Sequence, residues 1–237
     1  MTGWKELKVN LAYNGAIIDM SKQTSESFIL SAVISLSGGF QDAYTYNLRG
    51  KVFANAQTGN VVLMSQRFME GHFQKGLHYL IPILSFAMGI LLAEQISHHF
   101  RNYQRLHWRQ IILLLEIIVL TIVAFIPGTQ NVLANVLVSL ACAMQVQSFR
   151  KVNGYPYAST MCIGNLRSGT ESFSVYLRTK KEGALKKALH YYGIIFIFAI
   201  GAGVGGILSE LLGYKSILIS SGILIVAFVM MLEEHVK

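Results

Sequence analysis

Six apolar runs, each close to the length of a membrane-crossing helix, constrain this sequence more than any other feature. A helix needs about 20 predominantly apolar residues to cross the hydrocarbon core of a bilayer. The composition agrees, because 53% of the residues are hydrophobic, only 14% are charged and the mean hydropathy is +0.46. A soluble helical protein would need polar helix faces, whereas the run ending at Ile126 holds few polar residues. The sequence therefore predicts an all-α polytopic membrane protein with about six transmembrane helices, over Phe28 to Leu48, Leu77 to Ile96, Gln110 to Ile126, Val132 to Phe149, Ala188 to Leu212 and Ser216 to Leu232.

Residues 1–27 precede the first of these runs. Lys5 and Lys8 interrupt the region where a signal peptide would be hydrophobic, so no cleavable signal peptide is expected. Trp4, Leu7 and Leu11 have the spacing of one helix face, which is typical of a segment lying on a membrane surface. Residues 1–27 are interpreted either as an amphipathic, interfacial segment or as a loosely ordered tail.

The second half of the sequence repeats features of the first half in the same order. Gly59 and Asn60 recur as Gly164 and Asn165. The pentapeptide Lys-Gly-Leu-His-Tyr, which ends at Tyr79, recurs as Lys-Ala-Leu-His-Tyr, which ends at Tyr191. Chance matches between apolar runs are common, but collinear Gly-Asn and Lys-x-Leu-His-Tyr matches are not. We therefore predict two membrane repeats, residues 28–130 and residues 131–237. Each repeat would hold three spans and one Gly-Asn segment, Val52 to Phe68 in the first and Tyr157 to Phe173 in the second.

The distribution of Lys and Arg predicts how the repeats enter the membrane, because these residues accumulate on the cytoplasmic side. If the amino terminus is inside and neither Gly-Asn segment crosses, fourteen Lys and Arg residues lie inside, five lie outside, and Arg167 lies within the second segment. If both segments crossed, the basic cluster from Arg178 to Lys187 would lie outside, against the rule. Three spans per repeat is an odd number, so the second repeat would be inverted. The sequence predicts a 3+3 inverted repeat with both termini cytoplasmic.

The Gly-Asn segments have the pattern of re-entrant, broken half-helices. Val52 to Ala56 and Tyr155 to Ser159 are typical of extended chain, and a helix is expected to begin near Thr58 and again between Thr160 and Asn165. Non-helical backbone at membrane depth is tolerated where it is buried in protein or lines a watery cavity. Two helix amino ends converging from opposite faces would offer free amide donors to an anionic or carbonyl-bearing solute. The alternative is that the small residues only permit close helix packing.

Asp42 and Glu116 are the notable acidic residues within the expected spans, where ionisable residues are candidates for function. Asp42 either pairs with Arg167 or carries a proton that couples transport. Glu116 either shares in coupling, hydrogen-bonds a neighbour or lies at a dimer contact. The expected substrate-binding residues are Gln41, Asp42, Gln57, Thr58, Gly59, Asn60, Gln145, Gly164, Asn165 and Arg167.

The stretch from Gly38 to Met64, with its Asp42-Ala43 pair, Phe53 and the triplet from Thr58 to Asn60, resembles the YoaK-like family of bacterial integral membrane proteins, which is grouped under a domain of unknown function. The resemblance extends over roughly Phe28 to Leu232. It implies a multi-pass protein of the bacterial plasma membrane with about six spans, and it implies little about chemistry.

These features favour a small secondary transporter or channel for a small anionic or polar solute, with its site at the midplane between the two Gly-Asn half-helix starts. The alternative is a non-transporting membrane scaffold or regulatory subunit. An enzyme is not expected, because the sequence has no nucleophile-base pair, metal-binding motif or nucleotide-binding loop, and no cofactor or metal is expected. The expected partners are a second copy of the chain and anionic lipid head groups, which would meet Arg178 to Lys187, whereas no nucleic acid is expected.

Overall fold

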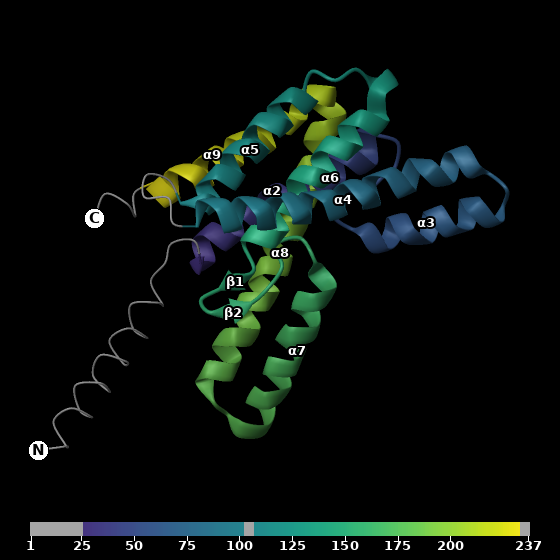
Figure 1. Cartoon of the computed structure of the whole chain (residues 1–237). Helices are drawn as coiled ribbons and strands as arrows, with labels where there is room; N and C mark the ends of the chain where they lie inside the picture. Colours follow the sequence, from purple (N-terminus) through teal and green to yellow (C-terminus); the bar gives the residue numbers. More distant parts are fainter. Residues whose placement is uncertain (1–25, 102–106, 233–237) are drawn as a thin grey trace, which may run out of the picture.

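Helices make up almost all of the regular structure in the computed structural model, which describes residues 26–101 and 107–232. The expected amphipathic segment, residues 1–27, lies almost entirely outside the described residues. Figure 1 shows the arrangement of the helices. In chain order they are α2 (Phe28–Leu48), α3 (Gln57–Met69), α4 (Phe73–Phe100), α5 (Trp108–Val123), the 3₁₀ helix η3 (Gly128–Gln130), α6 (Asn131–Ser148), α7 (Cys162–Thr179), α8 (Glu182–Leu212), the 3₁₀ helix η4 (Gly213–Ser216) and α9 (Ile217–Leu232).

The helices confirm the all-α class of a membrane protein. Each of the six apolar runs lies largely within one helix, and α3 and α7 occupy the two Gly-Asn segments. Three described stretches are long and apolar enough to cross a bilayer: Phe73–Phe100, Gly128–Ser148 and Glu182–Leu232, the last of which contains both α8 and α9. A two-stranded antiparallel hairpin, β1 (Lys151–Val152) with β2 (Tyr155–Pro156), joins α6 to the segment before α7. The number of spans stays a prediction.

Helices α2 and α8 pack side by side and run in the same direction. Near their beginnings the Phe28 and His190 rings lie 5.2 Å apart, and further along, Gly205 lies against the Phe40 backbone. Between these points Gly201 has no side chain, and an added Cβ would meet the carbonyl oxygen of Leu36. Small residues at such a crossing let two helix backbones approach closely, which is the usual way of packing helices in lipid.

Helices α4 and α6 form a second pair of this kind. The Ser85 hydroxyl donates to the Val136 carbonyl at 2.6 Å. Gly89 packs on the backbone of Leu140, as Gly201 packs on that of Leu36. These two helices also run in the same direction, so α6 packs beside α4 in the way that α2 packs beside α8.

The remaining contacts follow the same plan. Helices α3 and α4 form one hairpin and α7 and α8 form another, and the two hairpins project from the centre of the molecule in different directions (Figure 1). Helix α5 packs on α6 and on α9, which in turn packs on α2. The main apolar core lies among α2, α5, α6 and α9 and includes Ile34, Phe40, Leu120 and Leu224.

A fully buried arginine, Arg49, joins the end of α2 to neighbouring helices. Its Nη2 donates to the Val123 carbonyl at 3.0 Å and to the Tyr44 hydroxyl at 2.7 Å, and its guanidinium lies 4.2 Å from the centre of the Tyr214 ring. A charged group without a counterion is costly to bury unless its donors are used. Here carbonyl and hydroxyl oxygens and an aromatic face use them. From the sequence, Arg49 is one of the five Lys and Arg residues expected on the outer side of the membrane.

Candidate functional site

The segments that lead into α3 and α7 are held by the same pair of hydrogen bonds. Asn60 Nδ2 donates to the Phe53 carbonyl at 2.7 Å, and Asn60 Oδ1 accepts from the Phe53 amide at 3.3 Å. Asn165 makes the same two bonds with the carbonyl and amide of Ala158, at 2.7 and 3.2 Å. Each asparagine therefore acts as a clamp that fixes an extended residue seven positions before it. We call these bonds the asparagine clamps.

The helix starts themselves have no side-chain cap. Ala56 and Met161 are the N-cap residues of α3 and α7, and neither accepts a hydrogen bond from the first turn. An uncapped helix start exposes amide donors and the positive end of the helix dipole. This agrees with the expected half-helix starts, near Thr58 and near Thr160 to Asn165.

A pocket of about 930 Å³ lies between the two helix starts, and residues from α2, α4 and α8 complete its wall. In the register set by the two clamps, matching positions face it from both sides, 55–58 and 160–163. We call it the central pocket. It is lined by Asp42, Ala43, Tyr46, Asn47, Phe53, Asn55, Ala56, Gln57, Thr58, Ile83, Phe86, Ala87, Ile90, Thr160, Met161, Cys162, Ile163, Phe198, Ala202 and Gly206.

Two polar atoms in the wall of the central pocket are buried and, among the described residues, have no hydrogen-bond partner. They are Asn55 Oδ1 and Thr160 Oγ1, on side chains that are 2% and 5% exposed. Most buried polar atoms in native proteins have a partner, so these two atoms have hydrogen-bonding capacity that no described residue uses. The two atoms stand at matching positions on the two sides of the pocket. The rest of the wall is mainly apolar, with aromatic rings from Phe86 and Phe198.

Asp42 lines the central pocket, but it does not pair with Arg167 as one of the two sequence interpretations required. Its Oδ1 accepts a hydrogen bond from the Asn55 amide at 2.8 Å. Arg167 lies on an exposed part of α7 and does not line the pocket. The contact places the extended segment that contains Asn55 beside α2. Asp42 itself stands in α2, seven residues before Arg49.

Gln41 and Glu116 contact each other in the core, away from the central pocket. Gln41 Nε2 donates to Glu116 Oε1 at 3.1 Å and to the Ser220 hydroxyl at 3.2 Å, while the Cys142 thiol donates to Gln41 Oε1 at 2.7 Å. Glu116 is fully buried within one chain. The alternative that placed it at a dimer contact is therefore wrong, and the alternative that gave it a neighbouring donor is confirmed.

Of the ten expected substrate-binding residues, Asp42, Gln57 and Thr58 line the central pocket. Asn60 and Asn165 are used by the clamps, and Gln145 donates to the Ser159 hydroxyl at 3.2 Å. The lining residues that sequence reasoning missed are Asn55 and Thr160 together with the aromatic wall. Asn55 and Thr160 both stand five positions before a clamp asparagine, so aligning the segments on the clamps would have found them.

The described residues hold no group of three or more His, Cys, Asp or Glu side chains placed to bind a metal ion. A family model described as "Protein of unknown function (DUF1275)" matches residues 30–230. This match confirms the resemblance seen between Gly38 and Met64. No curated protein and no solved structure matches the chain.

Proposed function

We propose that this chain, which belongs to the DUF1275 family of proteins of unknown function, is a small secondary transporter or channel whose solute binds in the central pocket. The observation that carries the proposal is the pocket wall itself. Two uncapped helix starts face one cavity from opposite sides, and each contributes one buried polar atom that lacks a partner among the described residues, Asn55 Oδ1 and Thr160 Oγ1. Pockets with an apolar wall and a few convergent polar groups are the usual form of small-molecule sites.

The pattern of helix contacts supports an inverted 3+3 repeat around this pocket. The pair α2 with α8 has the same direction and the same glycine crossing as the pair α6 with α4. A single axis that exchanges the two repeats would relate both pairs, both hairpins and both clamps. In transporters of this plan the solute lies near the midplane between the repeats and is contacted by broken helices. The two Gly-Asn segments would then be re-entrant and would enter from opposite faces.

The charges of the pocket wall favour one of the two solute classes expected from the sequence, the polar solute over the anionic one. No Lys or Arg is among the described residues that line the central pocket, and Asp42 is. An anion would have only helix amides to balance its charge beside a carboxyl group. A polar solute without net negative charge, carrying an apolar or aromatic body, fits the wall better. The solute would place its hydrogen-bonding group between Asn55 and Thr160 and its body against Phe86 and Phe198.

The long helices offer a route for movement. Helices α4 and α8 each line the pocket and each pack on the first helix of the other repeat. Rocking one repeat against the other would therefore change which face of the membrane the pocket reaches. Such rocking needs a fixed frame, which a second copy of the chain would provide. The proposal thus includes a homodimer in the bacterial plasma membrane, with both termini cytoplasmic and no enzymatic activity.

A non-transporting scaffold or regulatory subunit is the second candidate, and specific contacts favour it. The clamps and the pairing of Gln41 with Glu116 use polar groups only to hold the fold together. In that case the central pocket would bind nothing, and its residues could be changed without loss of function.

The test blocks the central pocket with a bulky side chain. Ala87 lies on α4 in the pocket wall, and its neighbour Met88 is exposed and does not line the pocket. Thermal unfolding of the purified chain is measured against a panel of amino acids, nucleobases and small carboxylic acids for the parent, Ala87→Trp and Met88→Trp. A hit is then taken into proteoliposome uptake assays.

The proposal expects at least one compound to raise the Tm of the parent and of Met88→Trp but not that of Ala87→Trp. It expects the same compound to enter proteoliposomes that contain the parent. If no compound stabilises the parent, or if the stabilisation survives in Ala87→Trp, the central pocket is not the solute site and the scaffold candidate takes its place.

A further inference from the structure

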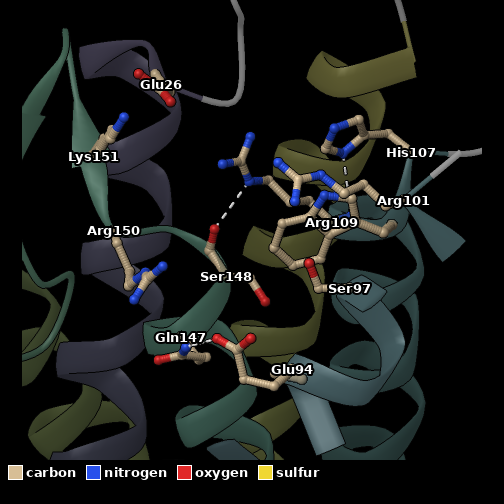
Figure 2. Close-up of a pocket in the computed structure, with 12 residues that line it drawn as sticks. Glu26, Glu94, Ser97, Arg101, His107, Arg109, Gln147, Ser148, Arg150 and Lys151 are labelled. Carbon is tan, nitrogen blue, oxygen red and sulfur yellow. Dashed lines mark hydrogen bonds between the residues drawn. The ribbon is translucent and has the colours of Figure 1, made fainter. Parts of the chain in front are cut away.

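A second pocket, of about 500 Å³, lies where the ends of α4 and α6 meet the beginning of α5 and the residues before α2 (Figure 2). It shares no lining residue with the central pocket. We call it the basic pocket. It is lined by Glu26, Ala93, Glu94, Ser97, Arg101, His107, Trp108, Arg109, Gln147, Ser148, Arg150 and Lys151.

Positive charge exceeds negative charge in the basic pocket, because four basic residues and two acidic ones line it. The basic residues come from three places in the chain: the end of α4, the beginning of α5 and the chain after α6. Figure 2 shows the basic side chains on opposite sides of the pocket, with Glu26 and Glu94 at its two ends. The basic residues are Arg101, Arg109, Arg150 and Lys151.

Backbone contacts hold these side chains in place. Arg109 Nε donates to the Ser148 carbonyl at 3.0 Å, which ties α5 to the end of α6. The Arg150 carbonyl accepts from the Tyr157 amide at 2.9 Å, and Lys151 begins strand β1, which pairs with β2. The basic residues around the pocket are therefore set by tertiary structure and are not a run of charges in one loop.

Three of the basic side chains have unused donors. Within the described residues, those of Arg101, Arg150 and Lys151 make no hydrogen bond and no ion pair. Within the described residues Glu94 makes no ion pair with them, and its carboxylate accepts a hydrogen bond from the Gln147 side-chain amide. Two guanidinium groups and one ammonium group therefore line one pocket with donors that no described residue uses, although all three side chains are exposed.

The basic cluster from Arg178 to Lys187 differs from this arrangement. Its residues lie on and beside one turn, between α7 and α8, and most are exposed. Lys180 lies over the Tyr176 ring, and Lys187 lies over the Tyr155 ring. The expected attraction of that cluster to lipid head groups would be diffuse, whereas the basic pocket has walls and a defined size.

We propose that the basic pocket binds a phosphate group between Arg101, Arg150 and Lys151. Arg presents paired donors that match two phosphate oxygens, and Lys adds a point charge. Basic pockets between transmembrane helices on the cytoplasmic side suit the head groups of anionic lipids, and Trp108 beside Arg109 is typical of the head-group level. The phosphate is carried either by such a lipid or by a soluble molecule. The proposal does not depend on the function assigned to the central pocket.

Two arms of one experiment separate the sources. Thermal unfolding of the purified full chain is followed against inorganic phosphate in one arm and against phosphatidylglycerol in phosphatidylcholine micelles in the other. The parent is expected to be stabilised with saturation by at least one probe. Saturation by phosphatidylglycerol alone assigns a lipid head group, whereas saturation by inorganic phosphate assigns a soluble source.

A matched pair of variants locates the effect. Arg150→Gln with Lys151→Gln is expected to raise the half-saturating concentration about thirtyfold, because each basic group near the head-group surface contributes about fivefold to binding. Lys181→Gln with Lys186→Gln removes the same charge from exposed positions and should leave it within about twofold. Arg101→Gln, a separate change at an exposed side chain, should also weaken binding. The proposal is overturned if neither probe saturates with the parent, or if the two double variants weaken binding equally.

Discussion

The chain segments that begin α3 and α7 have the same backbone clamp but different side chains at the central pocket. Asn60 and Asn165 each fix a residue seven positions earlier by two hydrogen bonds. Between these fixed points the pocket-facing positions differ, with Asn, Ala, Gln and Thr in the first segment and Thr, Met, Cys and Ile in the second. The first segment also has Asp42 beside it. Geometry is shared while chemistry is not, so one side of the pocket is polar and the other is largely apolar.

This difference separates two roles that sequence patterns combine. A residue repeated in both segments is a candidate for holding the backbone, because both segments have the same backbone conformation to stabilise. A residue present in one segment only is a candidate for contacting a solute, because an asymmetric solute needs different groups on its two sides. The clamps belong to the first kind and Asp42 belongs to the second.

The largest effect is expected from breaking the clamps. Asn60→Ala and Asn165→Ala each leave a backbone amide and a carbonyl without their partner, which costs about 1 to 3 kcal/mol because these two groups are only partly buried. Asn60→Ala should cost more, since Asn60 Nδ2 also donates to Gln57 Oε1 at 2.9 Å. The free energy of unfolding in mild detergent measures both. Gln66→Ala, an exposed change on α3, is the control.

If Asn60→Ala unfolded with the same free energy as Gln66→Ala, the clamp would not stabilise the segment, and Asn60 would return to the list of solute contacts. If only one of the two asparagine variants lost stability, the two segments would not share their geometry in solution.

The next largest loss of stability is expected at the glycines where α8 packs on α2 and where α4 packs on α6. An alanine Cβ at Gly201 would meet the Leu36 carbonyl, and one at Gly89 would meet that of Leu140. Separating two packed helices to make room costs about 1 to 3 kcal/mol. Gly203→Ala lies on the same helix in open space and should instead be neutral or slightly stabilising. Unfolding of the three variants tests whether both crossings are equally tight, and a neutral Gly89→Ala would refute that equality.

A smaller effect is expected at Thr160, whose hydroxyl is the buried polar atom, without a partner among the described residues, that the second segment contributes to the central pocket. Thr160→Val keeps the shape of the side chain and removes a buried hydroxyl that has no partner among the described residues. The free energy of unfolding should stay the same or rise, because an unpaired buried hydroxyl does not stabilise the fold. Affinity for a compound that binds the central pocket should fall about tenfold, the equivalent of one hydrogen bond. Isothermal titration of parent and variant measures the affinity, and a loss of stability without loss of affinity would contradict the role in binding.

The sequence predicted the helices well because membrane helices are set by local composition. Apolar length located α2, α4 and α6 within a few residues, and the small polar residues of the Gly-Asn segments located the starts of α3 and α7. These are features of single stretches of chain. The asparagines were also found, but their role was not, because a hydrogen bond to a backbone seven residues away looks the same in the sequence as a free amide.

The contacts that could not be predicted connect positions far apart in the chain. Gln41 meets Glu116 across 75 positions, and the Arg49 side chain reaches a carbonyl 74 positions away. Nothing near Arg49 in the sequence distinguishes a buried arginine from one in a loop. Only the packing of the helices decides whether Arg49 is buried, because the loop after α2 closes against the end of α5 once the helices are assembled. The alternative that paired Asp42 with Arg167 is wrong for the same reason, because the extended segment places the Asn55 amide, and not Arg167, beside Asp42.

The smallest effect on stability is expected at Asp42, the residue that most distinguishes the two sides of the pocket. Asp42→Asn retains an oxygen that can accept from the Asn55 amide, so the free energy of unfolding should change by no more than about 0.5 kcal/mol. Asp42→Val gives α2 the residue that α6 carries at the matching position, Val146, and it should cost about 1 to 3 kcal/mol because the amide loses its acceptor. Uptake of a pocket-binding compound into proteoliposomes, measured at several pH values, then separates the two roles. If Asp42 carries the coupling proton, Asp42→Asn abolishes the pH dependence of uptake while the fold is unchanged. A pH dependence that survives in Asp42→Asn limits this side chain to holding Asn55, and it makes the asymmetry of the pocket a matter of hydrogen bonding rather than of charge.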